Sequence, residues 1–231
     1  MSGGSSPFTK MLDNVFPRIP PFLDMISVQA EVLSKGMTVS VDYMSEATTA
    51  RFHEIMQLET RSRELREKHL DILNNAFSTP IDREDVLRSI TALEVPVSSI
   101  RVVIEEMEAL KIKSDNYLLE MAVILRESAA ALQRGFAKLD TTPAQAEPDA
   151  QVGLQCLSNV DRVYRKALSN LYSIDDDLNR MRSHADGAEV QAMIHVVEML
   201  KRREVYRHIR NIAARIAEAA QVLHGIVIQI S

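Results

Sequence analysis

Apolar residues recur at alternating spacings of four and three along most of this chain of 231 residues, and few breakers interrupt them. Such spacing places apolar side chains on one stripe of an amphipathic helix, which turns once in about 3.6 residues. The chain has seven glycines, eight prolines, no tryptophan and 5% aromatic residues, which disfavours β-sandwiches and barrels. The sequence therefore predicts an all-α protein.

Breaker and capping residues divide these stripes into six long helices. A tail is expected at residues 1–19, a first helical region (helices one to four) at 20–139, a linker at 140–149 and a second region (helices five and six) at 150–231. With 46% apolar residues, all of them can pack as one domain. The expected helices span about 21–46, 48–77, 81–112, 115–139, 150–183 and 188–230.

Charge and cysteine usage limit the compartment and the partners. With a formal net charge of −5, the protein lacks the positive electrostatic field that drives binding to nucleic acid. The apolar stretches are shorter than the roughly 20 residues that span a bilayer, so direct membrane insertion is not expected. A single cysteine, Cys156, cannot form an internal disulfide, which suits a reducing compartment. We expect a cytoplasmic protein.

Two carboxylates interrupt apolar stripes. Glu59 lies in the stripe of the second expected helix, and Asp161 lies in a line of leucines in the fifth. A buried carboxylate is costly unless it is paired or bound to a cation. The two explanations are a metal cluster on the inner face of the bundle, or local pairing of Glu59 with Arg63 and of Asp161 with Arg165 or a neighbouring hydroxyl. Ion pairing is the more economical explanation.

A cluster of cations lies midway along the last expected helix. It can hold an acidic partner loop or form a solvated helix face. No histidine lies close to Cys156 in the sequence, so a nucleophilic role is not indicated, and the chain is expected not to be an enzyme. The candidate partner-binding residues are Lys201, Arg202, Arg203, Arg207 and Arg210.

Several segments resemble the PhoU-like proteins described as phosphate-transport regulators or Pit accessory proteins. The most specific is Thr79-Pro-Ile-Asp-Arg-Glu-Asp85, and further matches are Asp161-Arg-Val-Tyr164, Arg203-Glu-Val-Tyr206 and Gly225-Ile-Val227. The resemblance implies two three-helix bundles packed together. It also implies a regulatory role in phosphate transport.

Members of that family carry acidic pairs, four residues apart, that bind iron or other divalent metals. Followed onto this chain, each pair has lost at least one carboxylate, so Glu59, Glu94 and Asp161 are weak remnants and no metal or other cofactor is expected. A divalent or ferric ion is the alternative. The four pairs fall on Glu59 and Arg63, Glu94 and Ser98, Leu157 and Asp161, and Arg210 and Ala214.

The resemblance thus implies a non-catalytic regulator or accessory protein of inorganic phosphate transport. It would act through protein–protein contacts on the cytoplasmic side, with an inorganic phosphate transporter or another protein as partner. The apolar helix faces are also compatible with a homodimer. The alternatives are a divalent-metal-binding bundle that uses the residual carboxylates, and a helical scaffold that has lost the family function.

Overall fold

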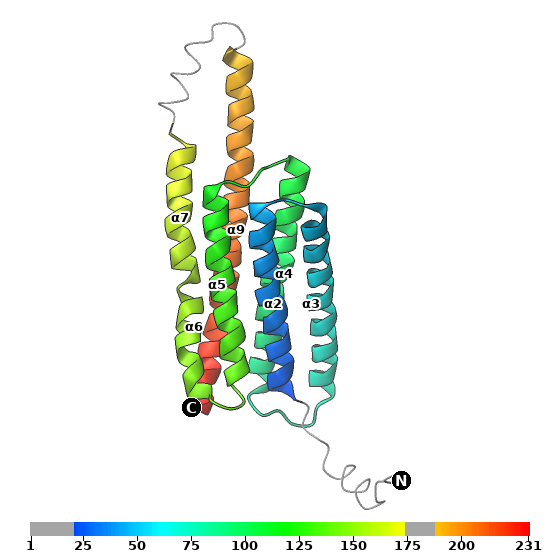
Figure 1. Cartoon of the computed structure of the whole chain (residues 1–231). Coiled ribbons are helices and arrows are strands. Elements are labelled where there is room, and N and C mark those ends of the chain that lie inside the picture. The colour runs from blue at the N-terminus through cyan, green and yellow to red at the C-terminus, as the bar shows by residue number, and fades with distance from the viewer. Residues whose placement is uncertain (1–20, 174–187) are drawn as a thin grey trace, which may run out of the picture.

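The computed structural model describes residues 21–173 and 188–231, and within these ranges it is helical without a strand (Figure 1). The predicted all-α fold is confirmed. The tail expected at 1–19 and the stretch of the fifth expected helix from 174 to 183 lie outside the described residues. The helices are α2 (Phe22–Ser45), α3 (Thr49–Asn75), α4 (Arg83–Leu110), α5 (Asn116–Lys138), α6 (Glu147–Leu154), α7 (Cys156–Leu171) and α9 (Ala188–Ile230), with a short 3-10 helix, η1, at Pro143–Ala146.

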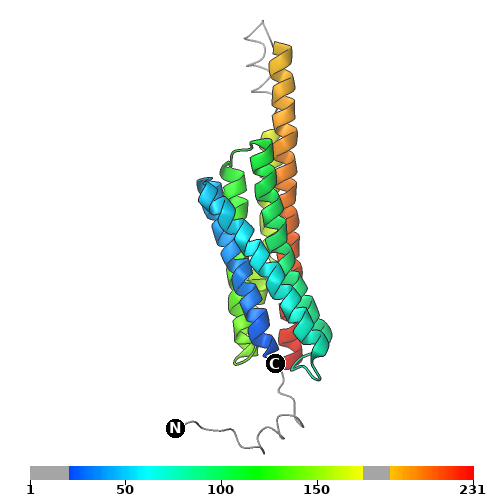
Figure 2. The same ribbon diagram turned by 90° about the vertical axis from the view of Figure 1, so that its right-hand side faces the viewer.

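The helices form two packed three-helix bundles, which are called the first half and the second half below (Figures 1 and 2). In the first half, α3 packs on α2 and α4; in the second half, α7 packs on α5 and α9, with α6 continuing its line. The halves join where α2 meets α5 and where α4 meets α9. One apolar core of large side chains, among them Phe22, Ile90, Met121 and Phe136, runs through both.

Side chains at the helix ends explain where several helices begin. Thr48 accepts a hydrogen bond from the backbone N–H of Arg51, and Asp82 accepts one from that of Glu84. Such caps satisfy N–H groups that have no partner in the first turn. At the end of α4, Lys111 adopts a left-handed conformation with φ of 57°. This conformation turns the chain toward α5.

The segment at 140–149, expected as a linker, contains η1 and the first residues of α6. Pro148 lies in the first turn of α6, where a missing N–H costs nothing. The buried carboxylate of Asp149 accepts hydrogen bonds from Arg134 Nε (3.1 Å) and Lys138 Nζ (2.5 Å) of α5. These bonds hold α6 against α5. The segment expected as a linker is therefore folded, and it leads into the short helix α6, which ends before Gln155.

No helix within residues 21–173 and 188–231 combines the length and the apolar character needed to cross a bilayer.

Candidate functional site

Glu59 is buried in the first half, on the face of α3 that meets α4. The Ser98 hydroxyl donates a hydrogen bond of 3.3 Å to its Oε1 atom. Two guanidinium groups lie farther away: Arg63 Nη1 is 3.9 Å and Arg101 Nε is 4.0 Å from the same oxygen. The carboxylate is therefore compensated by two nearby positive charges, and from the described residues it accepts only one long hydrogen bond.

Glu94 lies on α4 one turn before Ser98 and is half-buried. Because α3 and α4 are antiparallel and Ser98 lies opposite Glu59, Glu94 is about level with Arg63. Glu59, Arg63, Glu94 and Ser98 thus form one constellation across α3 and α4. A cation at its centre would lie next to the Arg63 guanidinium, which supplies positive charge and no ligand.

Further polar side chains share the interior of the first half. The Gln29 amide donates hydrogen bonds to the hydroxyl and the carbonyl oxygen of Ser62, at 2.8 and 3.1 Å. His69 is 4% exposed, and its Nδ1 atom is buried without a hydrogen-bond partner in the described part of the chain. Burial, followed by the charges of Lys68 and Arg61, lowers the pKa of His69 from 6.5 to about 4. The His69 imidazole is therefore neutral at physiological pH.

The corresponding carboxylate of the second half, Asp161 on α7, pairs with Arg210 on α9. Arg210 Nε donates to Asp161 Oδ1 at 2.5 Å, and Arg210 Nη2 lies 3.4 Å from Oδ2. The same guanidinium lies over the Tyr164 ring, 5.9 Å from its centre. The hydrogen bond to Asp161 raises the pKa of Arg210 above its already high value, so the guanidinium stays charged.

Glu59 and Asp161 do not belong to one site. Each is held within its own half, since α3 packs on α2 and α4 whereas α7 packs on α5, α6 and α9. Among the residues that the structure describes, no group of three or more histidine, cysteine, aspartate or glutamate side chains could hold a metal ion. The ion pair expected between Asp161 and Arg165 is replaced by the pair with Arg210, a residue of another helix that spacing in the sequence does not bring close to Asp161.

Most of the candidate partner-binding cations contact acceptors of this chain. Lys201 Nζ lies 3.0 Å from Glu198 Oε1 and 3.5 Å from the carbonyl oxygen of Leu110. Arg207 pairs with Glu204 one turn away, and Arg210 pairs with Asp161 as described. Arg203 is exposed, and no hydrogen bond or ion pair from it to the other described residues is found.

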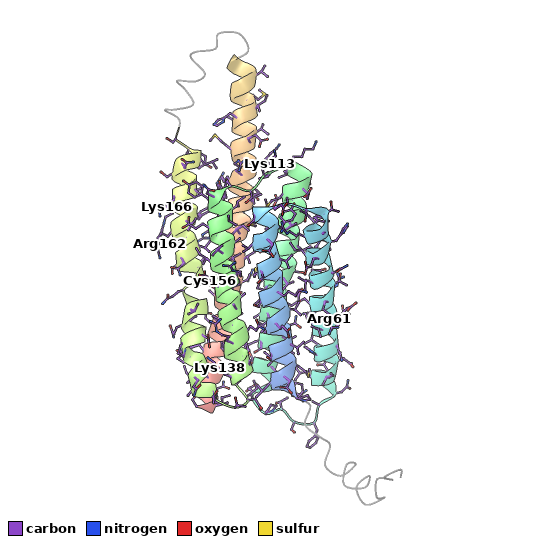
Figure 3. The ribbon with its side chains drawn as sticks, viewed as in Figure 1. Arg61, Lys113, Lys138, Cys156, Arg162 and Lys166 are labelled. Atoms are coloured by element: carbon purple, nitrogen blue, oxygen red, sulfur yellow. The ribbon has the colours of Figure 1, made fainter. Side chains whose placement is uncertain are left out.

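Arg202 takes part in a network that ties α9 to the turn between α4 and α5. Its Nη1 atom donates to the Lys113 carbonyl oxygen at 3.2 Å and to Asp115 Oδ2 at 2.9 Å (Figure 3 labels Lys113 in this turn). Tyr206 donates its hydroxyl proton to the same Oδ2 at 2.5 Å, while Oδ1 accepts from two N–H groups at the start of α5. Burial and the Asp115 charge raise the pKa of Tyr206. Arg202 and Tyr206 lie far from Asp115 in the sequence, so residue spacing does not reveal these partners.

Cys156 does not have the surroundings of a nucleophile. The side chain is fully buried at the start of α7, and burial raises the pKa of its thiol to about 11 (Figure 3). A thiol with so high a pKa is almost entirely protonated at neutral pH, whereas the thiolate is the reactive form.

The sequence matches no family model and no curated protein. Among solved structures, the chain is similar to the crystal structure of a PhoU-like protein from Shewanella oneidensis MR-1. The two are 9% identical, with a TM-score of 0.55, and the match covers 93% of this chain and 99% of the other. At this level of identity the likeness concerns the arrangement of the helices: this chain has the fold of a PhoU-like protein.

Proposed function

We propose that this chain is a non-catalytic regulator or accessory protein of inorganic phosphate transport that acts through protein–protein contacts on the cytoplasmic side. The observation that carries the proposal is the PhoU-like fold, shared over 93% of the chain. The resemblance of Thr79–Asp85 to the segment that opens the third helix in PhoU-like proteins supports it independently of the fold.

The chemistry of the described side chains agrees with a binding role. Glu59 and Asp161, the family-like carboxylates buried or half-buried at helix interfaces, face arginines of the same chain. Cys156 is buried with a raised pKa. Both carboxylates are thus compensated by arginines of the same chain and the thiol is unreactive, so we place the activity on the outer surface of the bundle.

Arg203 is the cation of the basic cluster best suited to contact an acidic partner, because it is exposed and, unlike the exposed Arg207, forms no ion pair with the other described residues. Lys201 and Arg202 instead bind the turn between α4 and α5, so reversing their charges would disturb that turn as well as any docking. Arg203→Glu is therefore the cleaner substitution. Arg162→Glu is a matched control: Arg162 is an exposed arginine on the side of α7 that faces away from the bundle (Figure 3).

In the first experiment, the gene that encodes this chain is deleted in the native host and the uptake of labelled phosphate is measured. Genes for the wild-type, Arg203→Glu or Arg162→Glu chain are then reintroduced one at a time. We expect uptake to change on deletion and to be restored by wild type and Arg162→Glu, but less by Arg203→Glu. The second experiment isolates the tagged chain and identifies bound proteins, with an inorganic phosphate transporter as the expected partner.

The outcomes test separately the part of Arg203 in docking and the role of the chain in phosphate transport. Equal co-purification of the transporter with the Arg203→Glu and wild-type chains would remove Arg203 from the docking surface. Uptake that does not respond to deletion, together with no bound transporter, would refute the proposed role in phosphate transport.

A further inference from the structure

The first part of α9 projects beyond the bundle. α9 has 43 residues, and its neighbours α4 and α5 have 28 and 23. The contacts of Lys201 with the Leu110 carbonyl oxygen and of Arg202 with Asp115 mark where α4 ends and α5 begins beside α9. Residues 188–200 lie past that level, a length of about 20 Å at about 1.5 Å per residue. Figures 1 and 2 both show this end of α9 standing clear of the other helices.

The projecting segment exposes large apolar side chains that are unusual for a helix surface. In the body of α9 the apolar side chains of the same helix, from Val205 to Val227, are almost all buried. Soluble proteins rarely expose contiguous apolar patches unless the patch binds something. The exposed apolar side chains are Val190 (63%), Met193 (71%), Ile194 (51%), Val196 (51%), Val197 (44%) and Leu200 (55%). All of them except Val196 share one side of the helix and are called the α9 stripe below.

The α9 stripe continues the side of α9 that packs on α4. His208 and Lys201, seven residues apart, both reach α4, at Glu106 and Leu110. Ile194 lies seven residues before Lys201 and therefore on the same side of the helix. α4 stops at Leu110, where Lys111 turns the chain away, so among the described residues nothing continues along this side. Contacts with α7 come from a different side of α9, that of Arg210.

We propose that the α9 stripe is a homodimer interface, in which the projecting segments of two copies of this chain pair side by side and antiparallel. Val190, Met193, Val197 and Leu200 are spaced three, four and three apart, a pattern that is the same in both directions. An antiparallel two-fold pair therefore sets Val190 against the partner's Leu200, and Met193 against the partner's Val197. Self-complementarity of this kind is what a two-fold symmetric interface requires.

The length of the projecting segment also fits a second copy of this chain. Each copy of residues 188–200 runs beside the equivalent residues of the other copy, in the space beyond the end of α4. The pairing stops where the two bundles meet. An antiparallel pair of short helices with apolar residues at spacings of three and four packs as in a coiled coil.

The area involved indicates a weak dimer. Complete burial of the α9 stripe in both copies removes on the order of 1,000 Å² of apolar surface from water, near the lower end of the range for specific protein interfaces. Such an interface gives a concentration-dependent equilibrium between monomer and dimer, with a dissociation constant of the order of micromolar.

Analytical ultracentrifugation of the full chain at about 1 to 200 µM, concentrations that bracket a micromolar dissociation constant, tests the interface. The wild-type chain is expected to shift from monomer toward dimer over this range. Met193→Glu places one carboxylate per copy in the contact and should raise the dissociation constant at least about 10-fold. Ile228→Glu is the matched control, because Ile228 is similarly exposed (67%) on the same helix at the opposite end, and should leave the equilibrium unchanged. A wild-type chain that stays monomeric, or equal effects of the two substitutions, overturns the proposal.

Disulfide pairing tests the orientation. A mixture of the single variants Met193→Cys and Val197→Cys, oxidised together, should give more cross-linked dimer than either variant oxidised alone, because the antiparallel pair sets position 193 against position 197. The wild-type chain, whose single cysteine is buried, is the blank. Strong cross-linking of each variant with itself, and no gain in the mixture, indicates a parallel pair and contradicts the antiparallel contact.

Discussion

Compared with the second half of the molecule, the first half carries many more polar side chains in its interior. Among the described residues, those buried in α2, α3 and α4 are Gln29, Ser34, Ser40, Glu59, Ser62, His69 and Ser89, against Ser128 and Asp149 in the second half. The second half instead brings its helices close together at glycines. A polar interior should respond to protonation and a closely packed interior to added volume, so each half has its own way to be destabilised.

The largest expected effect is the acid response of the first half through His69. Its pKa is about 4 in the folded chain and near 6.5 when unfolded. Between these values the unfolded state binds more protons, so stability falls as pH drops from about 6.5 to 4 and is fully present above that window. The loss approaches about 3 kcal/mol at the acid end.

His69→Leu removes this titration, so the free energy of unfolding of wild type minus that of the variant should be constant above about pH 6.5 and decrease below it. Urea denaturation at several pH values measures the difference, and carboxylates common to both chains cancel. A difference that does not vary with pH would show that the imidazole is solvated in the folded chain.

The next effect compares how the two halves respond to added side-chain volume at a glycine. An added methyl group at Gly153 of α6 would lie 2.7 Å from the Ala220 Cβ atom of α9 and 3.0 Å from a Leu132 methyl group, too close for van der Waals contact. At Gly36 of α2 the nearest atom, in Val97, would be 3.7 Å away. We expect Gly153→Ala to destabilise by about 2 kcal/mol, since α6 and α9 must separate. Gly36→Ala should be neutral or stabilise by up to about 1 kcal/mol through helix propensity.

Urea denaturation midpoints at constant m-value report both changes. Equal destabilisation by the two alanines would remove the distinction in packing between the halves.

The sequence was sufficient for the fold because its apolar stripes are long and few polar residues interrupt them. The four-three spacing of residues such as Val86, Ile90, Leu93 and Val97 predicted α4, whose bounds differ from the expectation by two residues at each end. The expected linker was less accurate: Pro143 and Pro148 suggested a break, but both lie at the starts of helical segments. Proline is compatible with a first turn, and local patterns cannot reveal the tertiary ion pairs that hold Asp149.

The candidate sites were predictable only where partners lie on the same helix. Glu59 with Arg63 was expected from their spacing of four and is present at 3.9 Å. Asp161 with Arg210 joins residues 49 positions apart, and it depends on the register of α7 against α9, which helix periodicity alone does not fix. Helix register likewise determines the contacts of Glu59 with Ser98 and Arg101, and the network of Arg202 with Asp115.

A smaller effect distinguishes the two carboxylate sites. The atoms of Asp161 and Arg210 approach to 2.5 Å, whereas Glu59 and Arg63 are 3.9 Å apart, with the Arg63 side chain 56% exposed. Double-mutant cycles with alanine should give a coupling of about 1 kcal/mol for the first pair and a few tenths for the second. High salt should reduce the weaker coupling further. A stronger coupling for Glu59 with Arg63 would mean that burial, and not distance, controls these pairs.

The smallest effect is expected from metal removal. A divalent cation about 4 Å from the Arg63 guanidinium would be repelled by about 8 kcal/mol at the effective dielectric constant of a protein surface, twice the value for two unit charges. Chelators and added divalent ions should therefore leave the melting temperature of the wild-type chain unchanged, and elemental analysis of chain purified without chelators should find no stoichiometric metal.

The double variant Arg63→Asp, Ser98→Asp makes this expectation decisive, because it removes the repelling charge and places four carboxylates across α3 and α4 together with Glu59 and Glu94. A melting temperature that rises with added divalent ion in the variant alone would show that the helices still hold the geometry of a metal site, and that Arg63 and Ser98 are what prevent its use. Stoichiometric metal in the wild-type chain would show instead that the guanidinium moves aside.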